Sequence, residues 1–117
     1  MTLRLDGDPS EVGLCHCRTC RRETGGPFMA YAVFPRAALT VVGETRSWIE
    51  TTDHRHFCPR CGSPLFATMD GDPAVEMRLG CLDDTSDLTP AFEIWVDRRA
   101  PWLAPLPGAA QHKRNLP

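Results

Sequence analysis

The chain has 117 residues, a net charge of −2 and a hydrophobic content of 42%. This size and composition predict one soluble globular domain spanning residues 1–117, with a real hydrophobic core. The slight acidic excess gives no general attraction to nucleic acid or to an anionic membrane, and no apolar run approaches the roughly 20 residues of a membrane span. Residues 1–8 contain no apolar signal segment, so we expect a cytoplasmic protein whose clustered cysteines bind metal rather than form disulfides.

Short strands are the predicted elements along most of the chain. Eleven prolines and nine glycines leave little room for long helices. Helical turns are predicted only at Cys17–Thr24 and Asp83–Asp87, and Pro105–Pro117 is predicted to be an irregular tail. The architecture is expected to be all-β, with short twisted strands whose loops are joined by metal. Six runs rich in β-branched and aromatic residues are the predicted strands: Met29–Phe34, Leu39–Val42, Ser47–Thr51, Pro64–Thr68, Val75–Leu79 and Phe92–Val96.

Two of these predicted strands alternate between apolar and polar residues. In Val75–Leu79 every second residue is apolar, and charged residues lie between them. Phe92–Val96 shows a looser alternation, in which Glu93 is one of the intervening residues. Because successive side chains of a strand point to opposite faces, this pattern predicts one buried face for each strand.

The six cysteines fall into three groups, and the first is the most informative. Cys15, Cys17 and Cys20 occur within six residues, in the run C-H-C-R-T-C. In an extended segment, the C-x-C spacing places two sulfurs on the same side, and Cys20 can return to that side across a short turn. Zn²⁺ prefers thiolate ligands in a tetrahedron, and packing alone explains three such close thiols poorly. The intervening His16 points the other way, which favours a packed or exposed histidine over a proton shuttle.

The other cysteines leave two arrangements open. Cys58 and Cys61 belong to a C-x-x-C-G loop, a pattern typical of zinc knuckles but shared by redox motifs. Cys81 stands alone and is predicted to be a core residue. Five clustered cysteines fit one tetrahedral site poorly. Either four of them close one structural site, or the triplet holds zinc with an open fourth position and the pair belongs elsewhere.

The segment C-H-C-R-T-C-R-R-E-T-G-G-P-F, from Cys15 to Phe28, resembles the glutathione-dependent formaldehyde-activating family, also called the centromere protein V-like family. Phe57–Phe66 is similar to the second motif of that family. Gly80–Asp84 and Ile94–Trp102 are similar to its C-terminal motifs. The resemblance therefore covers nearly the whole chain, with its motifs in the right order.

The resemblance implies a β-tent, Mss4-like zinc-binding fold with two zinc sites. Cys15, Cys17 and Cys20 would match the ligands of a catalytic Zn²⁺, and Cys58 and Cys61 would match half of a structural site. In the family, a second C-x-C nearer the N-terminus supplies the other half, and this sequence has no such pair. We therefore expect a structural site that lacks two ligands, and an exposed sheet edge through which a homodimer could form.

The resemblance also implies a carbon–sulfur lyase-type enzyme that joins glutathione and formaldehyde, or handles a related thiol adduct. Zinc would favour the thiolate form of the substrate. Because glutathione carries two carboxylates, arginines should bind it, and the candidates are Arg21, Arg22, Arg98 and Arg99. A non-enzymatic zinc module with a closed four-ligand site, or a degenerate inactive relative, are the alternatives. With 15 acidic residues against 13 basic ones, the sequence favours no nucleic-acid partner.

Overall fold

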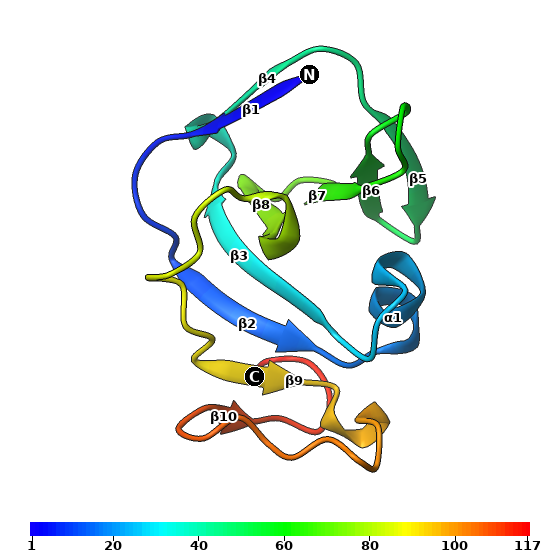
Figure 1. The fold of residues 1–117 in the computed structure, drawn as a ribbon, viewed down its shortest axis with the longest axis vertical. Coiled ribbons are helices and arrows are strands. Elements are labelled where there is room, and N and C mark those ends of the chain that lie inside the picture. Colours follow the sequence, from blue (N-terminus) through cyan, green and yellow to red (C-terminus); the bar gives the residue numbers. More distant parts are fainter.

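The computed structural model describes residues 1–117, which form ten strands and one short α-helix (Figure 1). The predicted all-β architecture is confirmed. β1 (Thr2–Leu5) and β4 (Leu39–Val42) form an antiparallel two-stranded sheet at one end of the molecule. The other strands form a twisted eight-stranded sheet in the order β10 (Ala110–Gln111), β9 (Phe92–Ile94), β2 (Glu11–Cys15), β3 (Met29–Pro35), β8 (Ala74–Arg78), β7 (Pro64–Met69), β6 (Asp53–Phe57) and β5 (Arg46–Glu50).

The central strand β3 has a separate hydrophobic core on each of its faces, because its side chains alternate. Ala32 and Phe34 point into the first core, which the leucines of β1 and β4 help to cover. Met29 and Tyr31 point into the second core, where they meet Phe92 and two cysteines of the predicted triplet. The predicted metal ligands therefore belong to one of the two cores and not to a surface loop.

The helix α1 (Arg18–Thr24) follows β2 directly and confirms the predicted helical turn. Cys17 caps its N-terminus, and the Cys17 sulfur accepts a hydrogen bond from the Cys20 amide at 3.3 Å. Gly25 ends the helix in the left-handed region, at φ 73°, and its amide bonds to the Arg21 carbonyl at 2.8 Å. A helix seven residues long buries little by itself, so its position depends on contacts with the sheet. No helix in the structure has the length and apolar character needed to cross a membrane.

A strand is present at each of the six predicted positions, and two predictions need correction. Phe92–Val96 is a strand only to Ile94, because Trp95 adopts the left-handed conformation at φ 57° and a 3₁₀ turn follows. Asp83–Asp87 holds no helix; Asp84 instead accepts hydrogen bonds from the amide and hydroxyl of Ser86. The C-terminal tail is irregular as predicted, apart from the two-residue strand β10.

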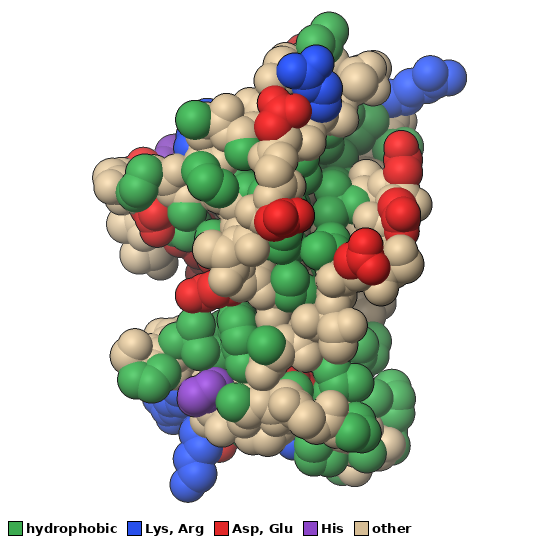
Figure 2. Space-filling view, turned by 90° about the vertical axis from the view of Figure 1, so that its left-hand side faces the viewer, with side chains coloured by type: hydrophobic (Ala, Val, Ile, Leu, Met, Phe, Trp, Pro, Cys, Tyr) green, Lys and Arg blue, Asp and Glu red, His purple; other side chains and the backbone are tan.

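One face of the molecule carries an apolar hollow with an acidic rim (Figure 2). Leu5, Phe34, Leu82 and Leu88 are among the residues that line it, together with Asp8, Asp83, Asp84 and Asp87. Four carboxylates around one opening repel anions. This face is therefore unsuited to an anionic small molecule.

We expect Gly13→Ala to destabilise the fold, because an added Cβ would lie 2.3 Å from Cε2 of the Phe92 ring. Gly13 is on β2 opposite Phe92 of β9, and the ring is held in the second core. Overpacking of this kind costs about 1–3 kcal/mol. Gly80→Ala is the matched control, since nothing lies within 4 Å of its added Cβ. Urea unfolding of both variants measures the difference, and equal midpoints would contradict this packing.

Candidate metal centre

Three cysteine sulfurs converge where β2 meets α1. Cys15 ends β2, Cys17 is the helix cap, and Cys20 lies in the first helical turn. The three sulfurs lie within 4.8 Å of one another. Zinc–sulfur bonds of about 2.3 Å in a tetrahedron place the sulfurs about 3.8 Å apart, so the three side chains fit a metal ion. No fourth His, Cys, Asp or Glu ligand atom joins the cluster.

The cluster is accessible to solvent at one of its three corners. Cys15 and Cys20 are only 5% and 7% exposed, whereas Cys17 is half-buried. An external ligand would therefore approach at Cys17. This asymmetry is the arrangement expected of three protein ligands with one exchangeable position.

The three thiols also share their hydrogen bonds. Hydrogen bonds from Cys15, and then Cys20, lower the pKa of Cys17 to about 2. The hydrogen bond to Cys17 raises the pKa of Cys15, with further contributions from Cys20 and from burial. The shared hydrogen bonds therefore favour the thiolate form at Cys17 and the protonated form at Cys15. A metal ion that takes all three sulfurs must displace the remaining protons, so its affinity rises with pH.

A buried carboxylate ties α1 to the sheet. Glu23 accepts hydrogen bonds from Arg78 of β8, at 2.6 Å from Nε and 3.0 Å from Nη2, and from Arg55 of β6, at 2.8 Å from Nη1. All three side chains are less than 10% exposed. Arg55 Nη1 also lies 3.7 Å from the Cys20 sulfur. This network was not predicted from the sequence, because its members are 32 and 55 residues apart and sequence spacing gives no signal of the pairing.

A second buried carboxylate binds His16, the residue between Cys15 and Cys17. His16 is 1% exposed, its Nε2 lies 2.7 Å from Glu93 Oε1, and its ring packs against Phe28. The expectation of a packed histidine is therefore met. The alternation of Phe92–Val96 predicted Glu93 on the open face of the strand, and this prediction is wrong. Glu93 is 2% exposed and also accepts from Arg99, Gln111 and the Leu106 amide.

Most of the chain matches one known protein family. The model of the family described as glutathione-dependent formaldehyde-activating enzyme matches residues 1–98 of the 117 residues. The chain belongs to this family. The match covers all six cysteines and both buried carboxylates, Glu23 and Glu93. A cysteine cluster that can hold a metal agrees with a zinc-binding family.

The arginines expected to bind substrate lie in different surroundings. Arg21 and Arg22, together with Arg18, line a groove of about 490 Å³ beside Trp102. None of these three arginines forms an ion pair with a carboxylate within 4.0 Å. Arg98 is exposed and does not line this groove.

Arg99 is engaged elsewhere in the structure. Its Nη2 bonds to Glu93 Oε2 at 3.2 Å and also contacts the Gln111 side chain. Only 16% of the Arg99 side chain is exposed. The structure therefore gives Arg99 a role in holding the C-terminal segment, and the signal for this role, a buried Glu93, is not visible in the sequence pattern.

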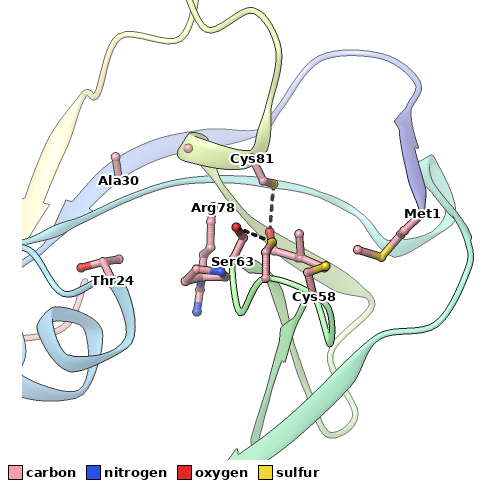
Figure 3. A pocket seen from close by; sticks show the side chains of 11 residues that line it. Met1, Thr24, Ala30, Cys58, Ser63, Arg78 and Cys81 are labelled. Atoms are coloured by element: carbon pink, nitrogen blue, oxygen red, sulfur yellow. Dashed lines mark hydrogen bonds between the residues drawn. The ribbon is translucent and has the colours of Figure 1, made fainter.

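The remaining three cysteines line another pocket, of about 480 Å³ (Figure 3). Cys58 and Cys61 lie in the turn between β6 and β7, where the Gly62 amide bonds to the Cys58 carbonyl at 2.8 Å. Cys81 is half-buried against the first core and its thiol donates to the Leu65 carbonyl at 3.2 Å. None of the triplet lines this pocket. The pair and the triplet are thus separate groups of cysteines in the structure.

We predict that Glu93→Gln lowers the free energy of unfolding by up to about 3 kcal/mol at pH 7. Burial opposes the Glu93 charge, but hydrogen bonds from Gln111, Leu106 and His16 outweigh it and lower its pKa from 4.5 to about 2. A depressed carboxyl pKa stabilises the fold above pH 4.5, and this stability is lost as the pH falls through about 2. Chemical unfolding as a function of pH measures the effect.

The difference between wild type and Glu93→Gln should therefore shrink as the pH is lowered from 5 towards 2. The exposed Glu44 provides the control, since Glu44→Gln should match the wild type at every pH. A Glu93→Gln difference that does not change with pH would contradict this account of the charge.

Proposed function

We propose that this protein is a zinc-dependent, carbon–sulfur lyase-type enzyme that acts on glutathione and formaldehyde or on a related thiol adduct. The observation that carries the proposal is the incomplete ligand set of the triplet. Three sulfurs converge, no fourth side-chain ligand joins them, and Cys17 leaves one edge accessible. A closed structural site would need four protein ligands, so the geometry favours the enzyme over a non-enzymatic zinc module.

Cys15, Cys17 and Cys20 would hold the Zn²⁺ ion. When bound, zinc supplies a Lewis acid that favours the thiolate form of the substrate thiol at neutral pH. In the reaction a bond forms between the glutathione sulfur and the formaldehyde carbon, while the carbonyl oxygen gains the proton that the thiol loses. The product is S-hydroxymethylglutathione, and the reverse reaction breaks the same carbon–sulfur bond. The contribution of the chain is to hold the two reactants close together in a productive orientation.

The groove beside α1 supports an anionic substrate. Arg18, Arg21 and Arg22 lie three and four residues apart, so their like charges repel on one helix face. No protein carboxylate offsets this charge within 4.0 Å, whereas the carboxylates of glutathione would. Trp102, which is 75% exposed, forms part of the groove wall. We propose that Arg21 and Arg22 bind the substrate, together with Arg18, which was not among the candidates predicted from the sequence.

Titration of the zinc-loaded protein with glutathione in a calorimeter tests the function. We expect saturable binding that Cys17→Ser weakens strongly, because Cys17 borders the accessible position. S-methylglutathione has the same carboxylates but no free thiol, so it should bind much more weakly than glutathione. Equal binding of the two ligands, or no saturable binding of glutathione, would contradict the proposal. Loss of formaldehyde from a mixture with glutathione then reports turnover.

The groove lined by Arg18, Arg21 and Arg22, here called the arginine groove, is tested separately. We expect the double variant Arg21→Ala/Arg22→Ala to weaken glutathione binding by roughly 3- to 30-fold, since exposed ion pairs contribute up to about 1 kcal/mol each. The matched control is Arg36→Ala/Arg46→Ala, which removes two exposed arginines that also lack ion pairs and changes the net charge equally. Equal losses in the two double variants would show a general charge effect and would contradict binding in the groove.

A further inference from the structure

Arg55 connects the cysteine triplet to Glu23, the carboxylate that ties α1 to the sheet. Its Nη1 atom lies 2.8 Å from Glu23 Oε1 and 3.7 Å from the Cys20 sulfur, while Nη2 lies 3.4 Å from Asp53. The side chain is 9% exposed. A guanidinium is charged at every accessible pH. The structure therefore holds a permanent positive charge, largely shielded from water, against one sulfur of the candidate metal centre.

This placement matters because of the charge of the loaded site. Three thiolates and one divalent cation carry a net charge of −1. Burying such a charge is costly unless an opposite charge lies nearby. Glu23 is shared between Arg55 and Arg78, so it does not cancel both cations. Asp53 and Glu76 form ion pairs with these arginines, and their side chains are about one-third exposed, so solvent weakens their attraction.

We propose that Arg55 is a positioning residue that stabilises the metal-loaded triplet by holding its positive charge next to the Cys20 sulfur. The inference rests on the proposed zinc site and adds a residue on β6 to it. Groups that bond to metal ligands orient them and tune the electrons available to the metal. Arg55 would do both, since the same Nη1 atom contacts the ligand sulfur and the carboxylate of the helix that carries it.

The effect of the Arg55 contact with sulfur can be tested separately from the role of Arg55 in holding Glu23. Arg78 holds both oxygens of Glu23 through two hydrogen bonds, at 2.6 and 3.0 Å. Glu23 therefore keeps a partner when Arg55 is replaced. Arg78 is as deeply buried as Arg55 and shares the same carboxylate, but it has no hydrogen bond to a cysteine sulfur. Arg78→Gln is accordingly a matched control for any loosening of α1.

The experiment measures metal affinity and ligand electronics in the full chain. Competition with a chromophoric chelator gives the Zn²⁺ affinity, and Co²⁺ loading gives the sulfur-to-metal charge-transfer bands. We expect Arg55→Gln to lower Zn²⁺ affinity about 10- to 100-fold, the usual effect of losing an outer partner of a metal ligand. Its Co²⁺ charge-transfer bands should move to longer wavelength, because a sulfur without the neighbouring cation donates electrons more easily.

Arg78→Gln should leave the band position of the wild type unchanged, and Arg55→Lys, which keeps the charge, should recover most of the affinity. Arg55→Met is a second neutral variant with the same expected band shift, should Arg55→Gln fold poorly. Unchanged bands and affinity in the Arg55 variants, or equal changes in Arg78→Gln, would overturn this inference alone. A wild-type chain that takes up neither Zn²⁺ nor Co²⁺ would overturn the proposed function as well.

Discussion

Three sulfur atoms must be held within 4.8 Å of one another at the junction of a strand and a seven-residue helix, and neither element can hold them alone. β2 is fixed by register, because Cys15 lies opposite Met29 of β3 on one side and Ile94 of β9 on the other. The helix is too short to be stable without tertiary contacts. The geometry of the candidate metal centre therefore depends on what anchors the two elements on either side of Cys17.

Two buried carboxylates supply that anchoring. Glu93 holds His16, the residue between Cys15 and Cys17, and Glu23 holds the helix that carries Cys20. Each carboxylate also binds parts of the chain that are distant in sequence. Glu93 accepts hydrogen bonds from Leu106 and Gln111 of the C-terminal segment, and Glu23 accepts them from β6 and β8. Residues after 98 lie outside the family match, yet they complete the Glu93 network and provide Trp102 in the arginine groove.

Patterns of neighbouring residues predicted much of this structure. Runs of β-branched and aromatic residues located six strands, and the spacing of Cys15, Cys17 and Cys20 predicted that their sulfurs would meet. The strand β6, with sequence Asp-His-Arg-His-Phe, was missed because its central Arg55 is buried through charge pairing and not through an apolar side chain. Glu93 was placed on the wrong side for the same reason. Its burial depends on His16, 77 residues away, and the alternation of apolar and polar residues within one strand cannot reveal such a partner.

X-ray absorption at the zinc edge of the metal-loaded protein tests the central claim most directly, because it counts the ligand atoms of the metal. Three sulfurs at about 2.3 Å and one oxygen or nitrogen are the result expected of a triplet with an exchangeable fourth position. On addition of glutathione, the count should rise to four sulfurs. Four sulfurs in the absence of added thiol would mean that a further cysteine closes the site, and would contradict the account.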